Sequence, residues 1–176
     1  MMIETERLIV REFTPDDAEG LQEIFGDPET MKNCEPAYDL DKTRRFLEDF
    51  CIGKHGALAA VLKGSGKLIG YILFNSMGED EHEDVYEIGW IFHRQYWRKG
   101  YAYEACSAVV NYAFETLYAP KLFAEAIDPV KSVGLMEKLG MIREGAQRSH
   151  TGDNFGGWAD LYLYGMLKTD WEVKHP

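Results

Sequence analysis

The chain has 176 residues, of which 45% are hydrophobic and 13% aromatic, and its 30 acidic and 19 basic side chains give a formal net charge of −11. This length predicts a single domain over residues 1–176 with a core of its own, and the aromatic content excludes a disordered chain. The negative charge argues against a nucleic-acid partner, because binding to many phosphates requires a basic face.

Three features bear on the compartment. The amino-terminal segment MMIETERLIV has no basic stretch followed by an apolar stretch, so we expect no signal peptide. We expect no membrane partner, because no apolar run approaches the roughly 18–20 residues of a spanning helix. The cysteines Cys34, Cys51 and Cys106 are widely spaced and fit reduced thiols better than a disulfide framework. We therefore expect a cytoplasmic protein, either a monomer or a homodimer.

Hydrophobic periodicity and turn residues divide the chain into helices and strands. Thr14 followed by Pro15 is typical of a helix start, and a Gly-Ser-Gly turn at 64–66 is typical of a β-hairpin. In chain order we expect a strand at 3–12, helices at 14–25 and 41–51 with a short turn or helix at 29–32 between them, strands at 57–62, 67–75 and 85–93, a helix at 100–117, a strand at 121–127, a helix at 130–139, and strands at 141–149 and 158–167.

This order predicts an α/β fold with a mixed sheet and helices on both faces, not the strict alternation of a Rossmann domain. We expect the carboxy-terminal aromatic residues Trp158, Tyr162, Tyr164 and Trp171 in the core of the sheet.

The segment 88–105, IGWIFHRQYWRKGYAYEA, carries the most chemical information. A buried strand leads into a turn with Arg98, Lys99 and Gly100, where a long helix begins. The first amides of a helix lack internal partners and lie at the positive end of its dipole, so this turn is suited to bind a phosphate. An ordinary connection with solvated basic side chains is the alternative. The chain lacks the P-loop, dinucleotide, zinc-protease and serine-hydrolase motifs, and no histidine lies at metal-ligand spacing to another, so we expect no metal.

Four segments in order resemble the GNAT superfamily of acyl-CoA N-acyltransferases, and its RimJ/RimL branch in particular. They are ETERLIVREFTPDDAEGL, YEIGWIFHRQYWRKGYAYEA, VGLMEKLGMIREGAQR and WADLYLYGMLKTDW. The resemblance implies a strongly twisted sheet whose two central strands splay apart, with acetyl-CoA as acyl donor entering the gap.

By this resemblance the pantetheine chain binds along Ile91, Phe92 and His93 as a missing strand would. The diphosphate rests on the amides of the turn and the first helical turn, with Lys99 within reach of a phosphate; the expected residues are Arg98, Lys99, Gly100, Tyr101 and Ala102. The chain departs from the branch at two places. Arg98 replaces a usual glycine, and Pro129 occupies the position of a usual asparagine, for which Asp128 or Ser132 are the candidate substitutes.

Amine acetylation requires a base, a polarised thioester carbonyl and a proton for the leaving thiolate. Glu87 is the candidate base, directly or through a water molecule, and an amide near Phe92 is the candidate group that polarises the carbonyl. For the acid, Ser132 and a water molecule remain alternatives, and His93 is a weaker candidate for either role. Each of these residues also has a purely structural alternative, such as an ion-paired strand glutamate for Glu87.

We expect residues 33–38 and the two amino-terminal helices to form the wall for a small-molecule or peptide amine. The acidic loop 78–84 attracts a cationic acceptor or merely solubilises the chain. Two functions follow: an enzyme that acetylates a primary amine, and a non-catalytic acyl-CoA-binding module of the same fold. A third function, a nucleic-acid-binding partner of the ribosome, is poorly supported because the sequence indicates no basic face.

Overall fold

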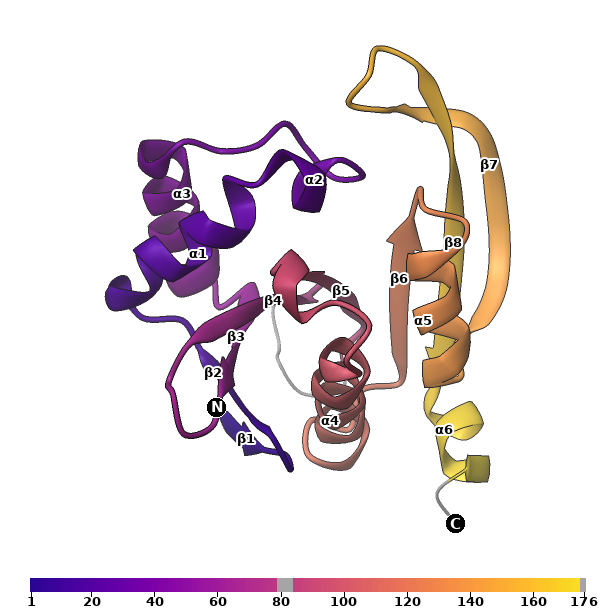
Figure 1. The fold of residues 1–176 in the computed structure, drawn as a ribbon. Coiled ribbons are helices and arrows are strands. Elements are labelled where there is room, and N and C mark those ends of the chain that lie inside the picture. The colour runs from indigo at the N-terminus through magenta and orange to yellow at the C-terminus, as the bar shows by residue number, and fades with distance from the viewer. Residues whose placement is uncertain (79–83, 175–176) are drawn as a thin grey trace.

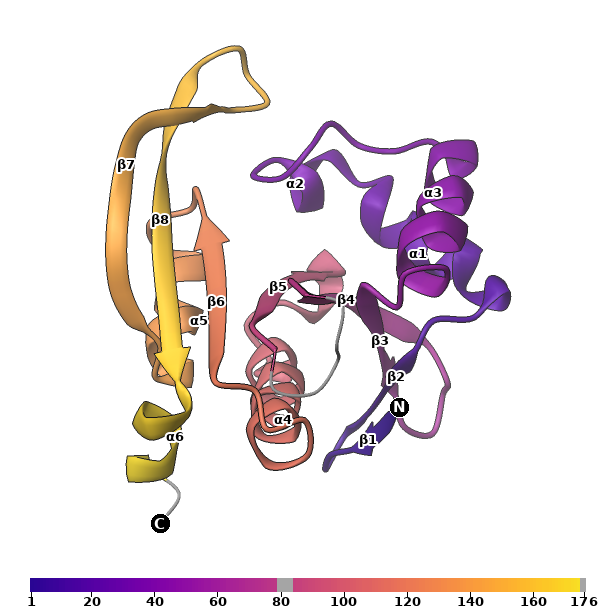
Figure 2. The ribbon, with the colours of Figure 1, turned by 180° about the vertical axis from the view of Figure 1, so that it is seen from behind.

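The computed structural model describes residues 1–78 and 84–174, which build an eight-stranded sheet with helices on both faces (Figure 1, Figure 2). The strand order is β1-β2-β3-β4-β5-β6-β8-β7. Neighbouring strands pair antiparallel, apart from β5 and β6, which are parallel. The expected α/β fold class, a mixed sheet flanked by helices, is confirmed. Most of the expected acidic loop, residues 79–83, lies outside the described residues.

The strands are β1 (Met2–Glu4), β2 (Leu8–Glu12), β3 (Ala57–Leu62), β4 (Leu68–Ser76), β5 (Tyr86–Phe92), β6 (Lys121–Ala126), β7 (Ile142–Gly152) and β8 (Trp158–Leu167). The helices are α1 (Ala18–Phe25), α2 (Pro28–Met31), α3 (Leu40–Phe46), α4 (Tyr101–Glu115), α5 (Lys131–Leu139) and α6 (Lys168–Lys174), with 3-10 turns at Pro15–Asp17 and Arg94–Tyr96 and a π-helical turn at Leu47–Ile52.

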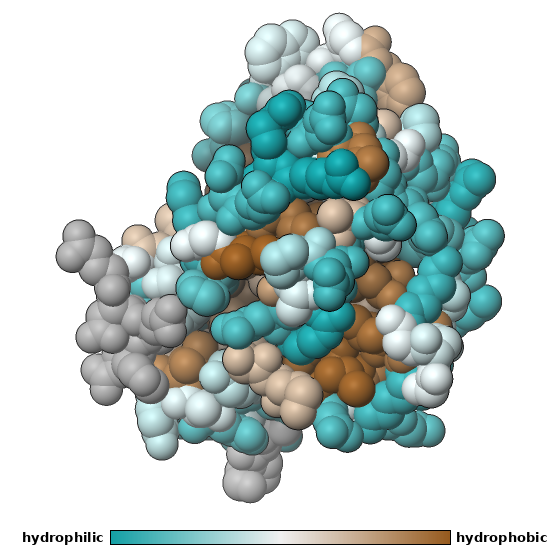
Figure 3. All heavy atoms as spheres, turned by 90° about the vertical axis from the view of Figure 1, so that its left-hand side faces the viewer, coloured by the Kyte–Doolittle hydropathy of each residue, from teal (hydrophilic) through white to brown (hydrophobic). Residues whose placement is uncertain are grey.

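The two faces of the sheet have separate cores. On one face α4 and α5 pack over the central strands, and Phe114 of α4 and Met136 of α5 are fully buried there. On the other face α1 and α3 cover β3 and β4, with Leu21 and Phe25 at the centre. Seen from the side of α1 and α3, the surface is largely hydrophilic with small hydrophobic patches (Figure 3). Each core fixes one set of alternating strand residues, which sets the register of the sheet.

The centre of the sheet is open. Tyr86 pairs with Leu122 and Glu87 with Phe123, and the register between β5 and β6 stops there although both strands continue. On its other side β5 stays paired with β4 as far as Phe92. The gap between β5 and β6, which we call the wedge, is the splay that the sequence resemblance implied.

Several expectations about elements are corrected. Residues 3–12 form two antiparallel strands, because the chain turns at Thr5, whose amide donates to the Leu8 carbonyl. The helix expected at 41–51 ends its α-helical part at Phe46 and continues as a π-helical turn. Trp158 is 71% exposed rather than part of the core, because it starts β8 at the outer end of the β7–β8 hairpin. Trp171 is buried as expected, but it lies on α6, a helix that the sequence did not predict, and its ring lies against Phe114.

Candidate functional site

The backbone of β5 has two differently bonded edges. The His93 amide donates to the Ile69 carbonyl at 2.9 Å, at the end of the β4–β5 ladder. Antiparallel strands alternate between residues that bond to their partner and residues that do not. The backbone groups of Ile91 and His93 therefore face β4, and those of Trp90 and Phe92 face the wedge. The expectation that a pantetheine chain bonds along Ile91 and His93 is thus corrected, because β4 already occupies their backbone groups. A chain with amide groups could bond to Trp90 and Phe92 there, as a strand would.

The turn after β5 and the first residues of α4 make up the segment expected to bind a phosphate, Arg98–Ala102, which we call the cradle. Arg98 and Gly100 both have left-handed backbone, with φ of 59° and 83°. This conformation costs about 1–2 kcal/mol for Arg98, whereas glycine adopts it without strain. The first helical bond of α4 runs from the Glu104 amide to the Gly100 carbonyl, at 3.0 Å. The amides of Tyr101 and Ala102 are therefore among those that lack a helical partner, at the positive end of the α4 dipole.

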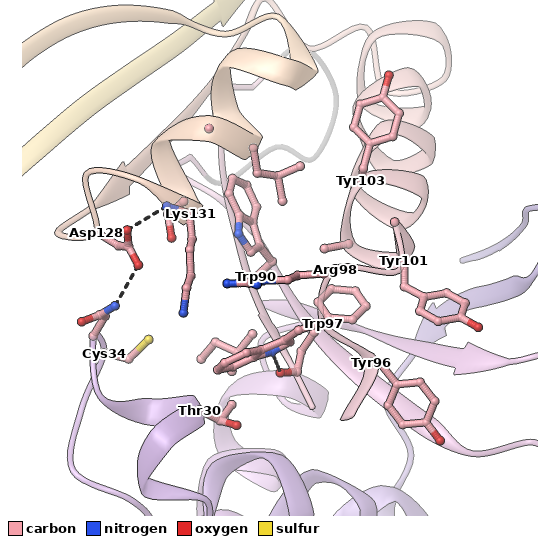
Figure 4. A pocket seen from close by; sticks show the side chains of 18 of the residues that line it. Thr30, Cys34, Trp90, Tyr96, Trp97, Arg98, Tyr101, Tyr103, Asp128 and Lys131 are labelled. Carbon is pink, nitrogen blue, oxygen red and sulfur yellow. Dashed lines mark hydrogen bonds between the residues drawn. The ribbon is translucent and has the colours of Figure 1, made fainter. Parts of the chain in front are cut away.

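A cavity of about 500 Å³ opens beside the wedge and the cradle (Figure 4). Its walls come from β5, the cradle, the first turn of α4, α2 and the segment after it, the β6–α5 connection and α5. Two carboxylates, Glu29 and Asp128, line it, and Glu29 is paired with Lys32 at 2.6 Å. The cavity is therefore locally positive in a strongly negative molecule. Its cationic side chains are Lys32, Arg98, Lys131 and Lys138.

The far wall of the cavity is fixed by Asp128. One carboxylate oxygen accepts from the amides of Val130 and Lys131, each at 2.8 Å, and caps the start of α5. The other oxygen accepts from the side chain of Asn33 at 3.1 Å. Figure 4 shows the bonds of Asp128 to the Lys131 amide and to Asn33. The Lys131 ammonium lies 4.8 Å from the centre of the Trp97 ring. Asp128 thus ties the segment after α2 to the β6–α5 connection.

The structure brings most of the sequence-predicted binding residues to this cavity. Ser132, in the first turn of α5, also lines it, opposite the cradle. Trp97 contributes a wall too, and its indole nitrogen donates to the Phe92 carbonyl at 2.6 Å. Of the eight expected binding residues, the six that line the cavity are Ile91, Phe92, Arg98, Gly100, Tyr101 and Ala102.

His93 and Lys99 lie elsewhere. The His93 ring lines a separate polar hollow of about 340 Å³ on the side of α1 and lies 3.8 Å from a Glu23 carboxylate oxygen. Burial and the nearby Lys67 charge lower its pKa. The ammonium of Lys99 lies 5.6 Å from the centre of the Tyr96 ring, and neither Lys99 nor His93 is among the lining residues.

Glu87 lies at the closed end of the wedge, where it pairs with Phe123, and it is not among the residues that line the cavity. Side chains alternate along β5, so Glu87 shares its face with Ile91, which packs on the α1 and α3 side. Glu125 of β6 is two residues beyond Phe123, the partner of Glu87, and faces the same way. Burial raises the pKa of Glu87, and the negative charge of Glu125 raises it further. A carboxylate with a raised pKa is a stronger proton acceptor near neutral pH.

Among the lining residues that sequence reasoning missed are Trp90, Lys131 and Lys138. Trp90 faces the wedge, which the alternation along β5 would have shown once its pairing with β4 was known. Lys131 and Lys138 are seven residues apart on α5 and so lie on one helix face. That spacing was visible in the sequence, but not which face meets the cavity.

Two absences concern only the part of the chain that the structure describes. Outside residues 79–83 and 175–176, no three His, Cys, Asp or Glu side chains are arranged to hold a metal ion. Within the same residues, no helix is both long and apolar enough to cross a membrane.

Comparisons with known proteins agree with this geometry. Residues 7–142 match the family model described as an acetyltransferase (GNAT) domain. The uncharacterized N-acetyltransferase YnaD of Bacillus subtilis is 31% identical over 173 residues, which cover 97% of this chain and 99% of the relative.

Solved structures show the same likeness. A GNAT-family acetyltransferase from Bacillus anthracis aligns with a TM-score of 0.86 and 33% identity, covering 96% of this chain and 99% of that one. A ribosomal-protein-S5-alanine acetyltransferase from Vibrio fischeri shares the fold, with a TM-score of 0.81 at 21% identity over 97% of this chain and 98% of that one. With an open wedge beside a positive helix start, and a family model that matches most of its length, the chain belongs to the GNAT acetyltransferase family.

Proposed function

We propose that the protein is an acetyl-CoA-dependent N-acetyltransferase that acts on a primary amine. The observation that carries the proposal is the wedge, which opens onto a positively lined cavity at the start of α4. The pantetheine amides bond to the wedge-facing backbone groups of Trp90 and to the Phe92 carbonyl, which also accepts from Trp97, and so complete the missing strand. The diphosphate binds the amides from Arg98 to Ala102, with Arg98 and Lys131 as counter-charges.

In the proposed reaction Glu87 is the general base. It takes a proton from the acceptor ammonium, directly or through a water molecule, and the free amine attacks the thioester carbon. A carbon–nitrogen bond forms as the carbon–sulfur bond breaks, the nitrogen loses its second proton to solvent, and the Phe92 amide stabilises the oxyanion. The leaving thiolate takes a proton from Ser132, which passes one on from solvent, or from a water molecule. The raised pKa of Glu87 suits it to accept a proton near neutral pH.

The acceptor approaches from the face of Glu87, between α3 and β6. Glu87 and Glu125 make this face negative, which favours a cationic amine. In the segment 33–38, which we expected to form the acceptor wall, Tyr38 donates to Glu35 at 2.8 Å. We propose that the acceptor is the amino-terminal amine of a protein or a small-molecule amine, as in the RimJ/RimL branch. Support comes from the sequence motifs and from the fold shared with the ribosomal-protein-S5-alanine acetyltransferase.

Calorimetry with acetyl-CoA, followed by titration of released thiol with a panel of amines, tests the proposal. The panel contains peptides with free amino termini, polyamines and amino acids, and Glu87→Gln is the control. We expect saturable binding and thiol release that depends on one class of amine and on Glu87. Binding without release from any amine would instead indicate a non-catalytic acyl-CoA-binding module. Absence of binding would refute both functions.

A further inference from the structure

The turn between β1 and β2 packs against the back of the cradle. It contains Thr5 and Arg7, two residues of the first sequence motif to which the proposed chemistry assigns no role. Both bind the carboxylate of Glu104, in the first turn of α4. The Thr5 hydroxyl donates to it at 2.6 Å, the Arg7 amide at 2.8 Å and the Arg7 Nε at 2.6 Å. Two motifs almost a hundred residues apart in the sequence are thus joined at one carboxylate.

Arg7 also binds the cradle itself. Its Nη1 donates to the Lys99 carbonyl at 2.9 Å, and its guanidinium lies 4.2 Å from the centre of the Tyr101 ring. In a trans peptide the carbonyl and the following amide point in opposite directions. By holding the Lys99 carbonyl at the back of the cradle, Arg7 directs the Gly100 amide toward the other side, where Gly100 lines the cavity.

The ion pair also removes an electrostatic conflict. A carboxylate in the first turn of α4 competes with a bound anion for the same amides and repels it. Burial raises the pKa of Glu104, but the hydrogen bonds from Thr5 and Arg7 outweigh burial, so the pKa is lowered and the carboxylate stays charged. The Arg7 guanidinium neutralises this charge and holds it behind the helix start, and only 17% of the Glu104 side chain is exposed.

We propose that Arg7 is a positioning residue for the acetyl-CoA diphosphate, which it serves by fixing the Lys99–Gly100 peptide and by neutralising Glu104. The inference rests on the proposed function, because it takes the cradle to be the diphosphate site. Arg7 is not among the residues that line the cavity, so it acts through the cradle and does not touch the ligand.

The first test compares Arg7→Met with Arg11→Met. Arg11, on the same hairpin, also makes a two-point ion pair, with Asp17, but lies away from the cradle. We expect Arg7→Met to weaken CoA binding about tenfold and Arg11→Met to change it less than about twofold. With S-acetylpantetheine, which lacks the diphosphate, Arg7→Met should keep the wild-type kcat/KM. Equal loss with both donors, or unchanged CoA affinity, would overturn the inference.

A rescue experiment separates positioning from a general loss of structure. Because Glu104 repels the diphosphate once Arg7 is gone, the double variant Arg7→Met, Glu104→Gln should bind CoA more tightly than Arg7→Met alone. Further weakening in the double variant would contradict the proposed neutralisation. If Arg7→Met does not fold, Arg7→Lys takes its place. It keeps the ion pair, loses the bond to Lys99 and should bind CoA about threefold more weakly; wild-type affinity would overturn the role of that bond.

Amide hydrogen exchange without any ligand makes the inference independent of the proposed function. The amides from Gly100 to Glu104 should exchange faster in Arg7→Met than in the wild type, with the rest of α4 unchanged. Unchanged exchange there would overturn the positioning role. If the wild-type protein does not bind CoA while exchange at the cradle still responds to Arg7, the proposed function fails and the contact to the cradle stands.

Discussion

Two glycines allow the role of the cradle to be separated from its contribution to stability. Gly100 in the cradle and Gly64 in the β3–β4 turn have the same left-handed φ of 83°. An alanine in this conformation costs about 1–2 kcal/mol. The added methyl group at Gly64 would meet nothing within 4 Å, and at Gly100 it would lie 3.3 Å from Nη2 of Arg7, the end of a flexible side chain. The backbone cost therefore dominates at both positions.

Gly100→Ala and Gly64→Ala should accordingly destabilise the fold by similar amounts, about 1–2 kcal/mol, or a decrease in Tm of about 2–8 °C for a chain of this size. Only Gly100→Ala should affect the ligand. Relaxation of the left-handed residue turns the cradle amides away from the diphosphate, and the loss of about one charge-assisted hydrogen bond weakens CoA binding about tenfold.

Urea unfolding gives the free energies of the two variants, and calorimetry gives their affinities for CoA. Equal stability losses with a loss of affinity confined to Gly100→Ala would support the cradle as the diphosphate site. If both variants lose affinity equally, the effect is one of global stability. If Gly100→Ala binds CoA as the wild type does, the assignment of the cradle is wrong.

Four further substitutions test other parts of the structure. Glu87→Gln should lower kcat by about 10²–10⁴-fold without changing CoA affinity. Glu125→Gln should shift the acid limb of the pH–rate profile to lower pH, because the loss of a like charge lowers the raised pKa of Glu87. An acid limb that does not move would refute the coupling of the two carboxylates. Asp17→Asn should cost about 1.5–3 kcal/mol in urea unfolding at neutral pH, since Arg11 donates to both carboxylate oxygens at 2.7 and 2.8 Å. Burial raises the pKa of Asp17, but these bonds and those from the Thr14 amide and hydroxyl lower it overall. The stabilisation by Asp17 therefore exists above the unfolded-state pKa and disappears as the pH falls through the folded-state pKa. A difference in stability between Asp17→Asn and the wild type that persists in strong acid would contradict this cause. Asn154→Ala removes two hydrogen bonds, 3.1 and 3.0 Å long, from the β7–β8 turn to carbonyls at the end of α2. It should speed amide hydrogen exchange at the end of α2 and leave exchange in α4 unchanged. Equal exchange in the variant and the wild type would show that these two bonds do not order the segment.

The sequence was most informative where local signals and tertiary structure agree. The residues from Ile88 to Ala105 combine a buried strand, a glycine turn and a long amphipathic helix, and each of these features is encoded within a few residues. The helical spacing of Cys106, Val109 and Ala113 places them on one face of α4, and all three are fully buried. The strand at 158–167 begins and ends where it was predicted.

The sequence was less informative where the local structure depends on contacts with residues far away in the chain. Alternation along β5 does not show which residues face the wedge, because that depends on the pairing with β4. The period-2 pattern at residues 3–12 gives no sign of the turn at Thr5, whose hydroxyl is held by Glu104 of α4. Trp158 is a large aromatic side chain of the kind expected in a core, and yet it is exposed, because the helices do not cover this end of the sheet. In each case the missing information is a contact between residues far apart in the chain.

The local distribution of charge at the cavity differs from the net charge of the molecule. A net charge of −11 repels anions at long range, but charges in solution are screened beyond about 8 Å at physiological salt. Within that distance a ligand in the cavity meets Arg98, Lys131 and Lys138, together with the amides at the start of α4. A duplex extends far past this positive region and meets the acidic surface around it, whereas a diphosphate fits inside it. The same charge distribution that disfavours a long polyanion therefore admits a small one.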